Sequence, residues 1–308
     1  MAPVDGARFW FAVQATGGAI WWLAVFASDG VQRWTLGGWS PGLLVGPDLV
    51  LFVGGSLIAA ARTGRTAALV AAAWTTGVTL ALAGYGLAER TAGWGVVLMA
   101  VATAGSLAAA GTIWSGHLPT RWFFIGPFSF RVARERTGGG HLRRTLVQMA
   151  VFWTTFFVIV PLVLSWAERR LRLGWPALDS LGVLVLGVAL LAVATPFAVW
   201  AARTMALLGE GTPLPRDTAR KLVVAGPYRY VRNPMAVAGA LQTIGVGLLL
   251  GSWMVVVVAL AGAVAWNVLI RPTEEADLSA RLGPAYDTYR ASVRCWIPAV
   301  PARKGGSG

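Results

Sequence analysis

The chain has 308 residues, of which 56% are hydrophobic and 13% are charged. A soluble globular protein carries about one quarter charged residues, so this chain has about half of the charge that a water-facing surface needs. Its single cysteine, Cys295, cannot form an internal disulfide. The composition therefore excludes a soluble enzyme, a disordered chain and a disulfide-stapled scaffold, and it predicts a polytopic membrane protein.

The chain is also strongly basic, with a formal net charge of +13. Lysine occurs only at Lys221 and Lys304, so 24 of the 26 basic residues are arginine, which together with the many alanines and glycines suggests a GC-rich bacterial genome. Basic proteins often bind nucleic acid, but these charges lie in short segments between apolar runs, as in the cytoplasmic loops of membrane proteins. We therefore predict membrane lipids as surroundings and no nucleic-acid partner.

Eight apolar runs are long enough to cross a hydrocarbon core of about 30 Å as helices that rise about 1.5 Å per residue. The predicted fold class is therefore all-α, a polytopic transmembrane helix bundle of about eight spans. The last two runs are separated only by Gly251, with Ser252 as a cap, which predicts a tight helical hairpin. The first run has no cleavage site of small residues and is predicted to be a retained span. In chain order the predicted spans are Phe9–Ala27, Leu43–Ala61, Thr66–Ala88, Gly93–Trp114, Thr145–Ala167, Ala177–Trp200, Pro234–Leu250 and Ser252–Ile270.

The distribution of basic residues predicts the sidedness of the chain. Counted along these spans, 21 of the 26 basic residues fall on the side that holds the N-terminus. Because Lys and Arg accumulate on the cytoplasmic side, both termini are predicted to be cytoplasmic in a multi-pass protein of the bacterial plasma membrane. Three regions follow: a four-helix transmembrane region at 1–115, a basic cytoplasmic linker at 116–144, and a second transmembrane region at 145–308. A Gly-Gly-Gly run at 138–140 predicts that the linker is flexible.

Few polar side chains interrupt the predicted spans. A charge at mid-bilayer costs about 2.5–3.5 kcal/mol on insertion scales. Asp48 and Asp179 lie near the starts of their spans, so hydrated helix ends are the favoured interpretation over a proton relay. The amides of Gln148, Gln242 and Asn267 are predicted to form interhelical hydrogen bonds rather than to bind a ligand.

The most informative segment lies around the start of the seventh predicted span. Gly226-Pro227 predicts a turn, and Asn233 before a proline predicts a helix N-cap followed by a first-turn proline. Arg229 and Arg232 precede this helix start, where a carboxylate or phosphate binds favourably. The alternative is that both arginines only anchor the chain at lipid headgroups.

A second block follows the eighth predicted span. Arg271-Pro272 is predicted to end that span, and Glu274, Glu275 and Asp277 are then predicted to start a short helix whose dipole they complement. An apolar stripe at helical spacing continues to residue 293, and a Gly-Pro pair at 283–284 divides it into two short helices. An amphipathic helix on the membrane surface is the alternative. Because an anionic leaflet repels carboxylates, the acidic pair is better placed against a cation or against the arginines of the preceding loop.

Together the two blocks resemble the isoprenylcysteine carboxyl methyltransferase and phospholipid methyltransferase superfamily. The first signature is the run GPYRYVRNPM at residues 226–235. The second is the acidic pair, followed at the family's spacing by a Leu-Gly pair at 282–283, two tyrosines and a terminal proline segment that ends at residue 298. Three positions depart from the usual pattern: Asn233 stands where many members have His, Ala236 where many have Tyr, and Leu282 where Phe is usual.

The resemblance implies an integral-membrane methyltransferase that uses S-adenosylmethionine. The cofactor would lie between the 226–234 loop and the C-terminal helices, which would close over it as a cytoplasmic lid, and a lipophilic acceptor would enter from the bilayer. Carried over by position, Arg232 would act at the methyl-transfer site, and either Glu274 or Glu275 would face the cofactor's ammonium group. The implied cofactor-binding residues are Gly226, Pro227, Tyr228, Arg229, Val231, Asn233, Pro234, Tyr286, Tyr289 and Arg294. No metal site is predicted.

Methyl transfer from a sulfonium needs in-line alignment and little water, and it demands no strong general base. This suits a site without histidine, since His117 and His141 lie in the linker and are predicted to be solvated. A carboxylate acceptor would pair with Arg232, whereas an amine or hydroxyl acceptor would lose its proton to Glu274 or Glu275. The acceptor is left open between a lipid, a lipophilic small molecule and a modified peptide that presents a carboxylate, thiol or amine, and no oligomeric state is predicted.

Two other classes of function compete. A membrane reductase of the sterol-reductase type would bind a phosphorylated nicotinamide cofactor on a related scaffold, and its 2′-phosphate would need several convergent cations. The acidic pair favours methyl transfer, whereas Arg229 and Arg232 keep the reductase open. A transporter or scaffold would concentrate polar residues at mid-bilayer, but here they concentrate in loops. The methyltransferase interpretation therefore requires Arg232 to lie close to Glu274 and Glu275 across a cavity.

Overall fold

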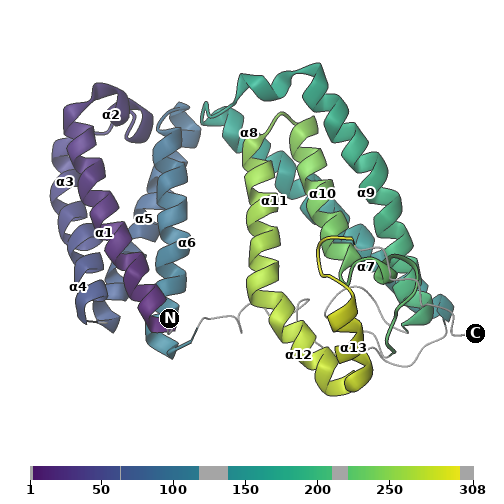
Figure 1. Cartoon of the computed structure of the whole chain (residues 1–308). Helices are drawn as coiled ribbons and strands as arrows, with labels where there is room; N and C mark the ends of the chain where they lie inside the picture. Colours follow the sequence, from purple (N-terminus) through teal and green to yellow (C-terminus); the bar gives the residue numbers. More distant parts are fainter. Residues whose placement is uncertain (1–2, 63, 118–137, 210–220, 299–308) are drawn as a thin grey trace, which may run out of the picture. The chain divides into compact units, whose positions relative to one another are not determined.

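The computed structural model describes residues 3–62, 64–117, 138–209 and 221–298 (Figure 1). The described chain consists of helices and the turns between them and contains no strand, so the predicted all-α fold is confirmed. It divides into two compact units: residues 1–119 with 167–173 form the first, and residues 120–166 with 174–308 form the second.

The described chain contains seven helices that are long and apolar enough to cross a membrane. An eighth apolar helix, Pro234–Leu249, has only 16 residues. At about 1.5 Å per residue it covers about 24 Å, less than the usual hydrocarbon thickness of about 30 Å. The predicted polytopic bundle is therefore confirmed, with one of its eight predicted spans shorter than a full crossing.

The first unit contains the four predicted N-terminal spans and one short helix that the sequence analysis did not predict. This short helix, α2 (Asp29–Thr35), begins at Ser28, whose side chain accepts a hydrogen bond from Val31 N. The second span is not one regular α-helix but a succession of α, π and α segments. The spans are α1 (Pro3–Ala27), α3 with η1 and α4 (Pro41–Asp48, Leu49–Gly54 and Gly55–Arg62), α5 (Arg65–Glu89) and α6 (Gly93–Ser115).

Small residues and one amide network hold the helices of this unit together. Phe11 is completely buried among alanines of α1, α4, α5 and α6. Beside it, Gln14 Nε2 donates to Ser56 Oγ at 3.0 Å, and Gln14 Oε1 accepts from Ser106 Oγ at 2.7 Å. Small residues allow close helix approach, and interhelical hydrogen bonds add attraction where lipid supplies no hydrophobic drive. The network joins α1, α4 and α6.

Asp48 does not lie at a hydrated helix end, and that prediction was wrong. Its carboxylate is buried, accepting from Trp22 Nε1 at Oδ2 and from Trp74 Nε1 at Oδ1, both at 2.8 Å. Two indole N–H groups thus replace the water that a carboxylate would otherwise need. The sequence pattern does not predict these hydrogen bonds, because the indole N–H donors belong to tryptophans within apolar runs. Asp179, by contrast, is exposed.

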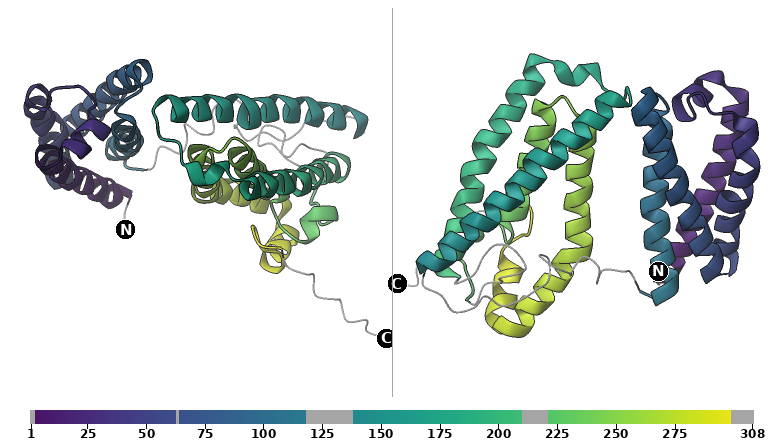
Figure 2. Two further views of the ribbon diagram at one scale, coloured as in Figure 1. Left: turned by 90° about the horizontal axis from the view of Figure 1, so that it is seen from above. Right: turned by 180° about the vertical axis from the view of Figure 1, so that it is seen from behind.

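The second unit is built around the close packing of α9 (Leu181–Leu208) against α10 (Pro234–Leu249). Gly187 allows the approach, since a Cβ there would lie 2.9 Å from Gly245 O. Gln242 Nε2 donates to Thr195 Oγ1 at 3.1 Å between the same two helices, as predicted for this amide. The helix formed by α7 (Gly138–Trp153), η4 (Thr154–Ile159) and α8 (Val160–Arg170) runs obliquely across this pair (Figure 2).

Two predicted boundaries in this unit were wrong. The sixth span was predicted to start at Ala177, but residues Pro176–Asp179 form the 3-10 turn η5. α9 then begins only after Ser180, whose side chain accepts from Val183 N. The Gly-Gly-Gly run at 138–140 forms the first turn of α7 rather than a flexible connection, so the helix of the fifth predicted span begins before Thr145. Residues 118–137 of the predicted linker lie outside the described residues, as does the side chain of His141. His117 is exposed, as predicted.

The eighth predicted span does not end at Arg271-Pro272. Three segments, α11 (Trp253–Ala265), η8 (Trp266–Ile270) and α12 (Arg271–Leu282), form one continuous helix. A proline in a regular α-helix collides with the carbonyl four residues earlier. The π segment that ends two residues before Pro272 widens this turn, and η4 stands in the same relation to Pro161. The acidic pair therefore does not start a new helix, and the predicted dipole contribution does not apply.

Replacing Asp48 by Asn tests the buried carboxylate of the first unit. One acceptor oxygen becomes an amide nitrogen, so one of the two indole N–H groups loses its partner inside the bundle. We expect the free energy of unfolding to fall by about 1–3 kcal/mol, measured by tryptophan-fluorescence melting of the detergent-purified protein. The matched change of the exposed Asp179 to Asn should shift it by less than about 0.5 kcal/mol. Coincident melting curves for Asp48→Asn and the wild type would contradict the assignment.

Candidate functional site

The loop before α10 takes its shape from a glycine and a helix cap. The 3-10 turn η7 (Gly226–Arg229) starts at Gly226, whose φ of 56° favours a residue without a side chain. A Cβ at this position would also lie 2.7 Å from Thr204 Oγ1 of α9. At the end of the loop, Asn233 Oδ1 accepts from Ala236 N at 3.0 Å and caps α10. The predicted turn and the predicted N-cap are both confirmed.

The chain after α12 turns back at a second glycine. Gly283 has φ of 61° and separates α12 from α13 (Pro284–Ser292), as the Gly-Pro pair predicted. Ser279 Oγ donates to Asp287 Oδ1 at 2.7 Å across this turn. This hydrogen bond links the end of the long helix to α13, and α13 runs back toward the loop before α10.

Two hydrogen bonds join the C-terminal segment to that loop. The Tyr289 hydroxyl donates to Tyr228 O at 2.7 Å in buried surroundings. Arg232 N donates to Arg294 O at 3.0 Å. Segments about 60 residues apart in the sequence are thus in direct contact, as the sequence interpretation requires.

An ion pair completes this junction. Arg232 Nη2 lies 3.0 Å from Glu275 Oε1, and the two side chains are only 13% and 15% exposed. Arg232 Nη1 donates to Arg290 O at 2.7 Å, while Arg290 Nε lies 3.9 Å from Glu275 Oε2. The predicted proximity of Arg232 to the acidic pair is therefore observed. Arg232 Nε is buried and has no hydrogen-bond partner within the described part of the chain.

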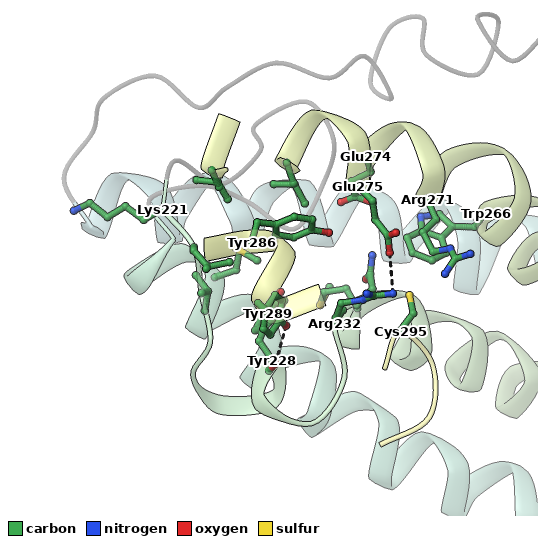
Figure 3. A pocket seen from close by; sticks show the side chains of 17 residues that line it. Lys221, Tyr228, Arg232, Trp266, Arg271, Glu274, Glu275, Tyr286, Tyr289 and Cys295 are labelled. Atoms are coloured by element: carbon green, nitrogen blue, oxygen red, sulfur yellow. Dashed lines mark hydrogen bonds and ion pairs between the residues drawn. The ribbon is translucent and has the colours of Figure 1, made fainter. Parts of the chain in front are cut away.

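These contacts surround a cavity of about 90 Å³, measured as the space open to the centre of a water-sized sphere. Figure 3 shows Glu275 directed from α12 toward Arg232, with Glu274 beside it, the tyrosines on one side and Arg271, Trp266 and Cys295 on the other. The wall is mixed in chemistry, combining charged, aromatic and apolar side chains. It comprises Met205, Lys221, Leu222, Val223, Tyr228, Arg232, Asn233, Met235, Trp266, Arg271, Glu274, Glu275, Leu278, Leu282, Tyr286, Tyr289 and Cys295.

The two carboxylates of the acidic pair have different surroundings. Glu275 faces Arg232 and Arg290. Glu274 lines the cavity as well, but it forms no ion pair with any residue that the structure describes. Because an unpaired carboxylate in partly buried surroundings is unfavourable, Glu274 is the member of the pair that suits a cationic ligand.

The hydroxyl and thiol groups of the wall are neutral at physiological pH. Burial raises the pKa of the Tyr228, Tyr286 and Tyr289 phenols above their usual range, and nearby carboxylates raise it further for Tyr228 and Tyr286. Burial also raises the pKa of the Cys295 thiol. The tyrosines therefore remain hydrogen-bond donors, and Cys295 is not poised as a thiolate nucleophile.

Seven of the thirteen residues that the resemblance implied line this cavity: Tyr228, Arg232, Asn233, Glu274, Glu275, Tyr286 and Tyr289. The other six do not. Arg229 and Arg294 are exposed, and Arg294 contributes its backbone carbonyl to the junction. The remaining four, Gly226, Pro227, Val231 and Pro234, shape the loop, and the last three of them are buried within it.

The sequence analysis missed several cavity residues, above all Arg271. It was interpreted as the end of a span because a proline follows it, and the continuation of the helix overturns that interpretation. A search for helical periodicity through Pro272 would have identified Arg271. It lies three and four residues before Glu274 and Glu275, and Leu278 and Leu282 continue the same helix face. Cys295, Trp266 and the apolar wall residues carried no local signal, since only the folded chain brings them together.

Comparisons with known proteins agree with the motifs. Residues 183–284 match the model of the family described as phospholipid methyltransferase. A stretch of 88 residues is 35% identical to the protein-S-isoprenylcysteine O-methyltransferase of Schizosaccharomyces pombe, and it covers 28% of this chain and 36% of the yeast protein. No solved structure matches the chain. The predicted resemblance to this superfamily is thus confirmed, and together with the apolar helices it supports a membrane methyltransferase.

Glu275→Gln tests the ion pair at the junction. The change preserves the size of the side chain but leaves the Arg232 guanidinium facing an uncharged amide in largely buried surroundings. We expect the free energy of unfolding to fall by about 1–3 kcal/mol, measured as reduced thermal stability in detergent. The matched variant Asp277→Asn breaks the Arg281 pair, whose side chains are 22% and 36% exposed, and should cost less than about 1 kcal/mol. Equal losses in both variants would show that the Arg232 pair has no special role.

Proposed function

We propose that the chain is an integral-membrane methyltransferase that takes its methyl group from S-adenosylmethionine and transfers it to a lipophilic acceptor. The observation that carries this proposal is the Glu274 carboxylate, which lines the cavity without an ion-pair partner in the described chain. Beside it, Glu275 is already engaged with Arg232. A cavity with this arrangement suits a ligand that brings its own positive charge. The family match over residues 183–284 supports the same reaction.

The donor set of the cavity fits this cofactor. When bound, S-adenosylmethionine supplies a methyl group on a sulfonium for in-line displacement. Glu274 would hold the α-ammonium group by a charge-assisted hydrogen bond. Tyr228, Tyr286 and Tyr289 offer apolar ring faces together with neutral hydroxyl donors, which suits an adenosine group that presents both a flat ring and polar edges.

The other wall residues would keep water away from the reacting groups. Met205, Met235, Leu278 and Leu282 contribute apolar surface to the same cavity. In such surroundings an anionic acceptor keeps less of its hydration shell, which favours its reaction with a cationic donor. Arg232 Nε is buried without a hydrogen-bond partner in the described chain, although the Arg232 side chain also interacts with the Cys295 thiol. We assign this guanidinium to an acceptor carboxylate or thiolate.

An amine acceptor would make a different demand, because it must lose a proton before or during the transfer. Glu274 cannot serve as the base while it holds the cofactor's ammonium group, so the candidate base is Glu275, which would have to leave its contact with Arg232. The yeast relative is named for an isoprenylcysteine substrate. For this chain we propose the broader class of lipids, lipophilic small molecules and modified peptides. We place the cavity at the cytoplasmic face of a bacterial plasma membrane, because 21 of the 26 basic residues share the predicted side of the N-terminus.

Calorimetric titration of the detergent-purified chain with S-adenosylhomocysteine and, separately, with NADPH tests the proposal. We expect S-adenosylhomocysteine to bind more tightly than NADPH. The Glu274 carboxylate attracts an ammonium group and repels a phosphate, although Lys221 and Arg271 also line the cavity. Transfer of labelled methyl groups from S-adenosylmethionine to extracted membrane lipids would then identify the acceptor class. Preferential binding of NADPH would instead favour the reductase.

Glu274→Gln tests the residue that carries the proposal. The amide cannot neutralise an ammonium group, so affinity for S-adenosylhomocysteine should fall about 10- to 100-fold, corresponding to about 1.5–3 kcal/mol. Thermal stability of the ligand-free protein should not fall, because Glu274 has no ion pair to lose in the described chain. Unchanged affinity would remove Glu274 from the site. Asp277→Asn, a neighbouring carboxylate outside the cavity wall, serves as the control and should bind as the wild type does.

A further inference from the structure

We propose that Arg271 binds the α-carboxylate of S-adenosylmethionine, so that Arg271 and Glu274 together recognise the two charges of its amino-acid end. The proposal rests on the proposed function for the identity of the ligand. It assigns a role to a residue that lies outside both sequence signatures and that the sequence analysis interpreted only as the end of a span.

The Arg271 and Glu274 side chains lie near each other on the cavity wall. Arg271 and Glu274 both line the cavity, and they are three residues apart in one continuous helix. Such residues are neighbours on one helix face, separated by a rise of about 4.5 Å along the axis. An α-amino acid carries its ammonium and its carboxylate on the same carbon. Its recognition therefore calls for two opposite charges placed side by side, as these are.

The helix backbone departs from regular α geometry just before Arg271. Trp266 and Arg271 both line the wall although they are five residues apart. In a regular α-helix, side chains at this spacing point about 140° away from each other. In the π segment η8 (Trp266–Ile270) each backbone hydrogen bond joins residues five apart, and this wider turn brings both side chains to one face. The bulge that accommodates Pro272 thus also positions Arg271.

The Arg271 side chain is held at its Nε, whereas its two terminal nitrogens form no ion pair in the described chain. Arg271 Nε donates to Asn267 O at 3.4 Å. Asn267 is itself fixed, since its Oδ1 accepts from Trp296 Nε1 at 2.8 Å, and Trp296 packs edge-on against Trp266 with ring centroids 5.4 Å apart. The two terminal nitrogens of Arg271 form no ion pair with any described residue. A guanidinium held in this way presents a planar fork that matches a carboxylate.

The charges of the cavity also separate into two sets. Arg232 and Glu275 neutralise each other at 3.0 Å. Of the other charged wall residues, Lys221, Arg271 and Glu274, the last two carry opposite charges and form no ion pair in the described chain. An arginine at the end of an apolar helix often anchors that helix at lipid headgroups. Arg271 differs from such an anchor because it is half-buried and lines the cavity.

Calorimetric titration with two ligands tests the proposal on the full-length protein in detergent. The ligands are S-adenosylhomocysteine and its decarboxylated analogue, which keeps the ammonium group and lacks the carboxylate. The wild type should prefer S-adenosylhomocysteine by about 10- to 100-fold, the loss expected when a charged hydrogen-bond partner is removed. Arg271→Gln should bind the two ligands with equal affinity, and its affinity for the decarboxylated analogue should stay within about threefold of the wild type.

Two further variants complete the design. Arg281→Gln removes the same charge from the same helix outside the cavity wall and should retain the wild-type preference. Arg271→Lys keeps the charge but loses the planar fork, so it should fold and show a reduced preference, which covers the case in which Arg271→Gln does not fold. A full wild-type preference in Arg271→Gln or in Arg271→Lys would overturn the proposal and leave the proposed function intact. A wild-type protein that binds neither ligand would refute the proposed function itself.

Discussion

The ion pair between Arg232 and Glu275 is the interaction on which the geometry of the cavity depends. It joins the loop before α10 to the middle of α12, and Arg232 also binds the carbonyls of Arg290 and Arg294 through its side chain and its backbone. Both side chains are mostly buried, so each needs the other to offset the loss of water. Because the pair neutralises one carboxylate and one guanidinium, Glu274 and Arg271 remain as wall charges without an ion-pair partner in the described chain, and Lys221 is a further cation of the wall.

Backbone irregularities at prolines and glycines set the positions of these charges. Pro272 does not end its helix because the π segment before it widens the turn, and the helix therefore continues to carry the acidic pair on the cavity face. Gly226 and Gly283 adopt positive φ at the two places where the chain must reverse. The site thus arises from three local departures from regular structure. They are the π segment before Pro272 and the positive φ angles of Gly226 and Gly283, which glycine adopts without steric strain.

The sequence predicted the parts of this arrangement that depend on local chemistry. Apolar runs located the spans, the Asn-Pro pair located the start of α10, and the motif led to the contact between Arg232 and Glu275. The failures occurred where the outcome depended on partners distant in the sequence. Asp48 looked like a helix end because its two indole donors lie in other apolar runs, and Arg271 looked like a terminus because a π segment leaves no mark in hydropathy.

The first unit and the cavity of the second unit differ in how far their polar groups are paired. In hydrocarbon every polar group needs a partner. The first unit largely meets this demand internally: Asp48 and Gln14 both have side-chain partners, and Trp21 Nε1 is its one buried polar side-chain atom without a hydrogen bond in the described chain. The cavity of the second unit instead holds an unpaired Arg232 Nε beside two opposite charges that have no ion pair there. Such groups are unfavourable in an empty protein interior, and they are explained most simply by a ligand that supplies their partners.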